Sequence, residues 1–114
     1  MNEMTLEEKI KRAADKNDDY VIHFDDVTLA DTIPLMLSKD YKERLLAEYL
    51  QLCIRWKKIE YAVSKRMANV GMVAASIDNT LRDLNRQAGA MSSYMYILKQ
   101  RLRNEDIAIQ TEFD

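Results

Sequence analysis

Two long stretches of this 114-residue sequence repeat apolar residues at alternating spacings of three and four, and this pattern constrains the fold more than any other feature. Such a repeat places apolar side chains along one side of a helix. Two matched helices joined by a short connection predict an antiparallel helical hairpin. The first stripe comprises Leu45, Tyr49, Leu52, Trp56, Ile59, Val63 and Met67 or Val70, and the second Ile77, Leu81, Leu84, Ala88, Met91, Met95, Leu98 and Leu102.

Cap residues and breakers set the expected limits of the two helices. Ser38 or Asp40 can accept the first amide hydrogens of a helix that continues to about Val70. Gly71 allows a turn or a frayed continuation, and the second helix is expected to start near Ser76. The chain holds two Gly and one Pro, which is typical of helices with short connections. We therefore expect an all-α fold.

The N-terminal 37 residues lack the long repeat. Thr5 and Glu8 form a capping-box pattern that predicts a helix to about Lys16, and Pro34 fits the first turn of a small helical segment. Residues 20–24 are β-branched and aromatic, and one strand cannot form a sheet within the chain, so an extended arm or pairing with a second copy is expected. The predicted division is an N-terminal helix and acidic arm over 1–37, a helical hairpin over 38–103 and an acidic tail over 104–114.

A second apolar stripe on each helix bears on assembly. Leu46, Leu50 and Cys53 form it on the first helix, and Tyr94 and Ile97 on the second. The N-terminal segments are too short to cover all of this surface, so we expect hairpins to associate into a homo-oligomeric helical bundle. The alternative is a compact monomeric bundle of three or four helices.

The charges are segregated along the chain. Residues 1–40 carry five basic and ten acidic side chains and residues 104–114 carry four acidic ones, whereas residues 41–103 carry twelve basic and five acidic ones. A basic middle of +7 between acidic ends would attract an anionic partner. Alternatively, the acidic ends fold back and neutralise the middle.

Several classes of protein are not expected. The single Cys53 cannot form an intramolecular disulfide, and neither a signal-peptide pattern nor a membrane-length apolar run occurs, which predicts a soluble cytosolic protein. The single histidine, His23, lies in the arm, and no catalytic motif accompanies it. The paired aspartates at 18–19 and 25–26 are typical of solvated turns. We therefore expect no enzyme, no metal and no cofactor.

Long cations and aromatic rings gather on the predicted hairpin. Guanidinium groups bind phosphates through two-point contacts and aromatic rings stack on bases, so this combination suits a nucleotide. The alternative is structural, with Arg44 and Glu48 an ordinary helix-surface pair and Tyr94 and Trp56 seam residues. The ligand-binding candidates are Tyr41, Arg44, Arg55, Trp56, Tyr94 and Arg101.

The segments YKERLLAEYLQLCIRWKKIE and LRDLNRQAGAMSSYMYILKQRL resemble a family of small helical phage proteins first noted in crAss-like phages. Typical members carry R-x-x-x-E-x-x-x-L-x-x-[RK] on one helix and L-x-x-Q-x-x-x-M-x-x-Y-x-x-x-L-x-x-R on the next. The match covers about half the chain and leaves out residues 1–37 and the tail. The matching positions are Arg44, Glu48, Leu52 and Arg55, then Leu84, Gln87, Met91, Tyr94, Leu98 and Arg101.

This family is similar in kind to phage anti-CBASS proteins, which sequester cyclic nucleotide signals of bacterial defence without turning them over. The resemblance implies a cyclic oligonucleotide ligand in a pocket between subunits, in the cytoplasm of the infected host. It assigns Arg44, Arg55, Tyr94 and Arg101, whereas Tyr41 and Trp56 come from residue chemistry alone. One alternative is an interaction protein that binds a host or virion protein through the spare stripe. DNA or RNA binding through the basic middle is disfavoured by the acidic ends.

Overall fold

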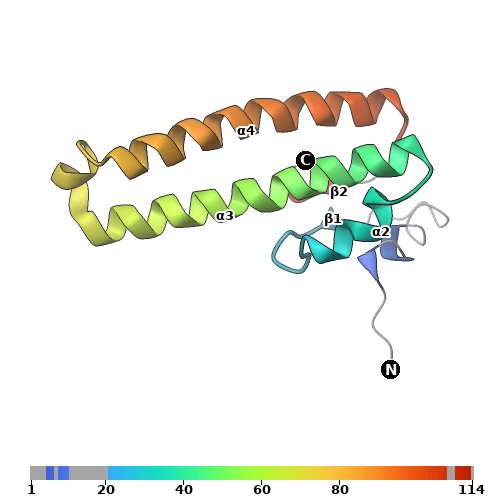
Figure 1. Cartoon of the computed structure of the whole chain (residues 1–114), viewed down its shortest axis with the longest axis horizontal. Coiled ribbons are helices and arrows are strands. Elements are labelled where there is room, and N and C mark those ends of the chain that lie inside the picture. The colour runs from blue at the N-terminus through green and yellow to red at the C-terminus, as the bar shows by residue number, and fades with distance from the viewer. Residues whose placement is uncertain (1–4, 7, 11–20, 108–109, 114) are drawn as a thin grey trace.

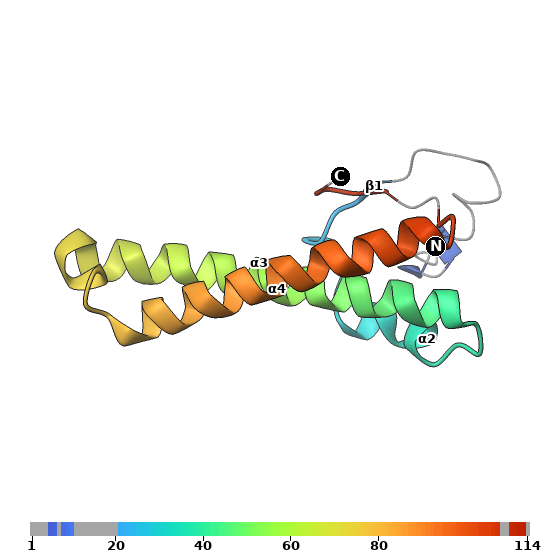
Figure 2. The ribbon, with the colours of Figure 1, turned by 90° about the horizontal axis from the view of Figure 1, so that it is seen from above.

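A long helical hairpin dominates the computed structural model, which describes residues 5, 6, 8–10, 21–107 and 110–113 (Figure 1). In chain order, the elements are β1 (Val21–Ile22), the 3-10 turn η1 (Ala30–Thr32), α2 (Ile33–Met36), α3 (Tyr41–Ala75), α4 (Asn79–Asn104) and β2 (Gln110–Thr111). Helices α3 and α4 run side by side, and α2 lies on the side of α3 away from α4 (Figures 1 and 2). The molecule measures 52 × 36 × 25 Å. The mostly helical fold agrees with the all-α prediction.

Helix α3 begins where the sequence predicts and ends in a kink. The Asp40 side chain accepts a hydrogen bond from the Lys42 amide at 2.9 Å, which satisfies an orphan donor of the first turn. Near the other end, Gly71 has φ 79° and ψ 168°, a backbone conformation that side chains disfavour. A last helical turn follows and ends at Ala75, so Gly71 makes a kink within the connection.

Helix α4 begins at Asn79, three residues later than the predicted start near Ser76. Asp78 caps it by accepting from the Leu81 amide at 2.8 Å, and the same carboxylate receives Arg66 Nε at 3.0 Å and Nη2 at 2.9 Å. The hydrogen bond from Arg66 lowers the pKa of Asp78. Because Ile77 precedes this cap, its side chain is 81% exposed, and its assignment to the buried seam was wrong.

The N-terminal segments build a core against one side of α3. Leu46, Leu50 and Cys53 are buried by this core, to which Leu6, Ile22 and Leu35 also belong. Thr5 and Glu8 form the predicted reciprocal cap. The Thr5 amide donates to Glu8 Oε2 at 3.2 Å, and the Glu8 amide donates to Thr5 Oγ1 at 3.1 Å. The rest of the predicted N-terminal helix lies outside the described residues. The N-terminal segments thus cover the second stripe of α3, in line with the expectation that they cover part of the spare apolar surface.

The two ends of the chain form a small parallel sheet. Val21 pairs with Gln110 and Ile22 with Thr111, and the Glu112 amide then donates to the Ile22 carbonyl at 3.0 Å. The prediction that the arm could find no strand partner within the chain was therefore wrong. The last residues are also no free tail, since Thr111 is buried. The division of the chain at residues 37 and 103 stays a prediction.

The far half of the hairpin has no third layer among the described residues (Figure 2). Its seam is buried mainly at Val63, Leu81 and Ala88, whereas Met72 and Val73 near the kink are 88% and 86% exposed. On α4, Tyr94 and Ile97 remain exposed, as the second stripe requires. The predicted homo-oligomer therefore rests on the α4 face and the hairpin tip, because the α3 stripe is already covered.

Candidate functional site

Polar side chains bridge α3 and α4 along one exposed face of the hairpin. The Tyr94 hydroxyl donates to Glu48 Oε1 at 2.8 Å, and Arg101 Nη2 donates to the Tyr41 oxygen at 2.5 Å. The Arg101 guanidinium carbon also lies 6.0 Å from the centre of the Tyr41 ring, within the range of a cation–π contact. We call Tyr41, Glu48, Tyr94 and Arg101 the polar ladder.

The polar ladder follows from helix geometry. On each helix its members are seven residues apart, which is two turns or about 10.5 Å along the axis. Because the helices are antiparallel, position 41 faces 101 and position 48 faces 94. The same register places the next pair at Arg55 and Gln87, which are both exposed. The two bonded pairs and the pair of positions 55 and 87 thus form three rungs, one above the other, along one face of the hairpin.

Hydrogen bonds within the ladder raise the pKa values of Tyr94 and Arg101. The hydrogen bond to Glu48 raises the pKa of Tyr94, and burial adds to this, while Arg101 acts in the opposite direction. The contact with Tyr41 raises the pKa of Arg101. Arg101 has five N–H donors and uses one on Tyr41, so further donors can bind an anion. The rings of Tyr41 and Tyr94 are 46% and 42% exposed and can stack on a flat ligand.

The remaining predicted residues lie outside the bonded ladder. Arg44 Nη1 donates to the Ser38 carbonyl at 2.8 Å, beside the start of α3. Arg55 is exposed and has no bonded partner among the described residues. Trp56 is half-buried on another side of α3, with its ring 5.3 Å from Phe113 at an interplanar angle of 88°. The structure therefore brings Tyr41, Tyr94 and Arg101 together and separates Trp56 from them.

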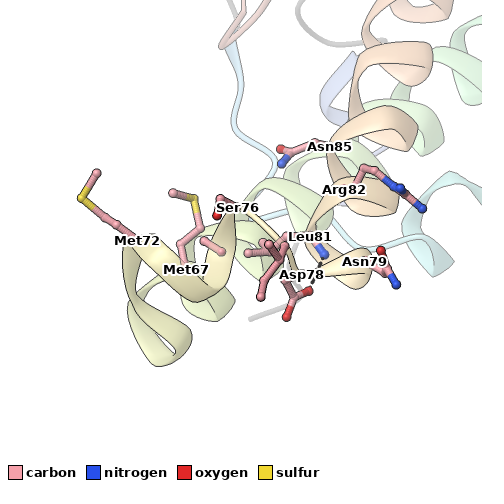
Figure 3. Close-up of a pocket in the computed structure, with 10 residues that line it drawn as sticks. Met67, Met72, Ser76, Asp78, Asn79, Leu81, Arg82 and Asn85 are labelled. Carbon is pink, nitrogen blue, oxygen red and sulfur yellow. Dashed lines mark hydrogen bonds between the residues drawn. The ribbon is translucent and has the colours of Figure 1, made fainter.

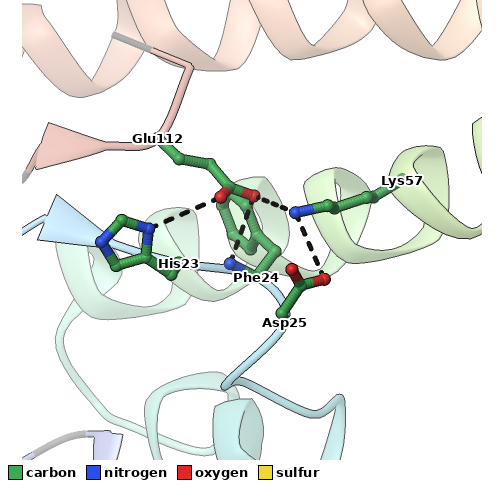
Figure 4. Close-up of polar contacts among 5 residues, drawn as sticks. All are labelled: His23, Phe24, Asp25, Lys57 and Glu112. Carbon is green, nitrogen blue, oxygen red and sulfur yellow. Dashed lines mark hydrogen bonds and ion pairs between the residues drawn. The ribbon is translucent and has the colours of Figure 1, made fainter.

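A second polar cluster joins the two ends of the chain to α3 (Figure 4). Glu112 Oε1 lies 2.7 Å from Lys57 Nζ and 3.3 Å from the Phe24 amide, and Oε2 lies 3.6 Å from His23 Nδ1. Lys57 also pairs with Asp25 at 3.3 Å. We call the contacts that hold residues 110–113 against the arm and α3 the C-terminal clasp.

Two cavities lie away from the polar ladder. One, of about 360 Å³, lies at the hairpin tip, and its lining includes Met67, Met72, Asp78 and Arg82 (Figure 3). The other, of about 440 Å³, adjoins the clasp and is lined by Phe24, Asp25, Val27, Thr28, Ile54, Lys57, Lys58 and Tyr61. None of the four ladder residues lines either of these two cavities.

Comparison with protein families gives one match, in which the Sequestin family model aligns with residues 39–104. That range spans more than half of the chain. The chain belongs to the Sequestin family. The family name indicates sequestration of a ligand, and the matched range holds both long helices and the whole polar ladder. Comparisons with curated proteins and with solved structures gave no significant match.

The Sequestin match leaves out most of the clasp. Lys57 and Trp56 fall inside residues 39–104, whereas His23, Phe24 and Glu112 fall outside. Among the described residues, no group of three or more His, Cys, Asp or Glu side chains could hold a metal ion. Within the same residues, no helix combines the length and apolar character needed to cross a bilayer.

Sequence reasoning missed two kinds of residue. Glu48 belongs to the family motif, but it was treated as a surface partner of Arg44, whereas its carboxylate accepts from Tyr94. Its position seven residues after Tyr41 was the available signal. Glu112 and Phe113 were assigned to a tail, and no periodicity in the sequence connects them to Phe24 or Lys57.

Proposed function

We propose that this Sequestin protein is a phage immune-evasion protein that sequesters a cyclic nucleotide second messenger without turning it over, in the manner of anti-CBASS proteins. The observation that carries the proposal is the convergence of Arg101 with the two half-exposed rings of Tyr41 and Tyr94 on the face that the family match contains. The anionic ligand's phosphates bind the guanidinium, and its bases stack on the tyrosine rings.

Charge and spacing on this face suit a ligand with more than one phosphate. Arg44, Arg55 and Arg101 carry three positive charges and Glu48 one negative charge, so these four residues sum to a net charge of +2. Arg101 and the Arg55 position are separated by two rungs of the ladder, about 21 Å along the axis, which exceeds the reach of a single phosphate. Arg101 of one copy and Arg101 of a second copy would supply matched clamps.

A second copy also supplies the enclosure that a sequestering site needs. Binding sites for small molecules bury most of the ligand surface, whereas Tyr41 and Tyr94 of the ladder are 46% and 42% exposed in one chain. Ile97 is exposed on α4 between Tyr94 and Arg101 in the sequence, next to the ladder. Apolar packing of two such faces would close the ladder over a ligand, which is the proposed role of the homo-oligomer.

The proposal is tested by Arg101→Ala with Arg103→Ala as its matched control. Both arginines are exposed in the last turn of α4, but only Arg101 contacts the ladder. Isothermal titration with a panel of cyclic nucleotides should show at least a roughly tenfold loss of affinity for Arg101→Ala and little change for Arg103→Ala. The bound nucleotide, released by denaturation and chromatographed, should be chemically intact. Equal binding by all three proteins would reject the ladder as the site.

The exposed hairpin tip favours a second candidate function, in which the protein binds a host or virion protein. Met72, Val73 and Ile77 are each more than 80% exposed, which is unusual for large apolar side chains clustered at one end. In that case, Met72→Ser with Val73→Ser would abolish partner binding and Arg101→Ala would not. Leu46, a member of the spare stripe predicted on the first helix, is buried in the core and is not available to a partner.

A further inference from the structure

The last described residues occupy α3 and the arm in the way that a small ligand occupies a binding site. Glu112 and Phe113 are neighbours in the sequence, and each fills a separate subsite (Figure 4). One subsite is polar and receives a carboxylate, and the other is formed by aromatic rings. The arrangement has the chemistry of a site for an anion attached to a flat ring.

The polar subsite is a convergence of donors on one carboxylate. Lys57 Nζ donates to Glu112 Oε1 at 2.7 Å and the Phe24 amide donates to the same atom at 3.3 Å, while His23 Nδ1 lies 3.6 Å from Oε2. The Glu112 side chain is only 19% exposed in this setting. A cationic side chain, a backbone N–H and an imidazole are the groups that proteins use to bind phosphate oxygens.

The aromatic subsite holds the Phe113 ring between two others. Phe24 stacks on it with a centroid separation of 5.1 Å and an interplanar angle of 14°, and Trp56 meets it edge-on at 5.3 Å. Stacking of this kind depends on the flat face of a ring and tolerates any base. A nucleobase can therefore replace the phenyl ring.

The cavity of about 440 Å³ extends the site beyond the volume that the two side chains fill. It shares Phe24, Asp25 and Lys57 with the clasp. Exposed Lys58 and Tyr61 complete its lining, beside apolar Val27 and Ile54. A ribose and a second phosphate have room there, close to a second lysine.

We propose that the segment 110–113 is an internal surrogate ligand, and that a nucleoside phosphate competes with it for the clasp site formed by Phe24, Trp56 and Lys57. The phosphate replaces the Glu112 carboxylate and the base replaces the Phe113 ring. The ligand then holds the arm against α3 in place of β2, and residues 110–113 are released. The clasp site shares no residue with the polar ladder, so binding at the clasp can be tested independently of the proposed sequestration.

The single Trp56 provides a direct readout, because the chain has no other tryptophan. The probe is adenosine 5′-monophosphate, titrated into the full-length protein while tryptophan emission is recorded. Glu112→Gln removes the competing charge and keeps the side-chain shape. The nucleotide concentration at half-saturation should therefore fall at least about tenfold relative to the natural sequence. Glu105→Gln, which changes an acidic residue outside the clasp, should leave half-saturation unchanged. Lys57→Met added to Glu112→Gln should abolish the response.

Unchanged emission in both the natural protein and Glu112→Gln would overturn the proposal, as would equal half-saturation in the two. Loss of the response in Arg101→Ala would also overturn it, because the probe would then bind at the ladder. Hydrogen exchange on the natural protein tests the displacement without a variant, so it remains informative if Glu112→Gln disturbs folding. Saturating adenosine 5′-monophosphate should increase exchange of the amides of residues 110–113, and unchanged or slower exchange there would reject the displacement.

Discussion

Glu112 shows how much one carboxylate can organise when several donors meet it. Burial alone would raise its pKa, but the hydrogen bond from Lys57 and the Phe24 amide outweigh burial, and the pKa is lowered. The ionised carboxylate is therefore the form that the folded chain prefers. His23 and Lys57 face the Glu112 carboxylate, and Asp25 pairs with the same Lys57.

Replacing Glu112 with Gln should remove part of the acid sensitivity of the fold. Since the folded-state pKa lies below the ordinary value of 4.5, the stabilisation is complete above pH 4.5 and is lost as the pH falls through the folded-state pKa. We expect a contribution of about 1 kcal/mol at pH 7, because Lys57 is one-third exposed and solvent weakens the pair.

Urea unfolding of the natural protein and Glu112→Gln at pH 7 and pH 3.5 measures this contribution. The free energies of unfolding should differ at pH 7, and the difference should be smaller at pH 3.5. A difference that is the same at both pH values would show that ionisation of Glu112 does not stabilise the fold.

Residue chemistry alone suggested Tyr41 and Trp56, and the structure places Tyr41 beside Arg101 but Trp56 on another side of α3. Seven-residue spacing reports which side chains share a helix face, and it works for the ladder because both of its helices are long. Trp56 also belongs to the apolar stripe, and that pattern does not specify which neighbour covers the ring. The neighbour is Phe113, from a segment without periodicity.

At the scale of elements, the two long helices follow from the heptad stripes and their caps, whereas the sheet does not. Asp40 and Asp78 occupy cap positions, and short polar side chains of this kind favour helix starts. The β1–β2 pair has two residues in each strand and joins segments almost 90 residues apart. Strands this short carry too little alternation for a sequence to predict their partner.

Asp78→Ala should weaken the start of α4 and loosen the hairpin connection. The carboxylate caps Leu81 and holds Arg66 through two contacts, so both interactions disappear together. We expect the melting temperature to fall by roughly 5 °C, which is typical for loss of a helix cap in a chain of this length. Differential scanning calorimetry measures it.

Asp83→Asn is the matched control for Asp78→Ala. Asp83 lies in the same helix, is 70% exposed and pairs only with its neighbour Arg82 at 3.9 Å. The melting temperature of Asp83→Asn should stay close to that of the natural protein. Equal shifts for the two variants would mean that the cap and the Arg66 pair contribute nothing specific.

For the whole molecule, the structure concentrates its core at one end, and exposed apolar side chains lie on the α4 face and at the hairpin tip as well as around α2. The core joins the N-terminal segments to the first half of α3 and the last turns of α4. The sequence predicted that the N-terminal segments cover only part of the second stripes, but not which stripe, because burial by short irregular segments leaves no repeat in the sequence. Tyr94 and Ile97 of the second α4 stripe are exposed, as predicted, and Tyr94 is part of the polar ladder.

Native mass spectrometry of the full-length protein, alone and with cyclic mono-, di- and trinucleotides, tests sequestration by the polar ladder most directly. The account predicts a discrete oligomer that gains the intact mass of one nucleotide in a fixed ratio to its subunits. Arg101→Ala should keep the oligomer and lose that mass. An oligomer or a monomer that gains no mass from any nucleotide in the panel would contradict the account.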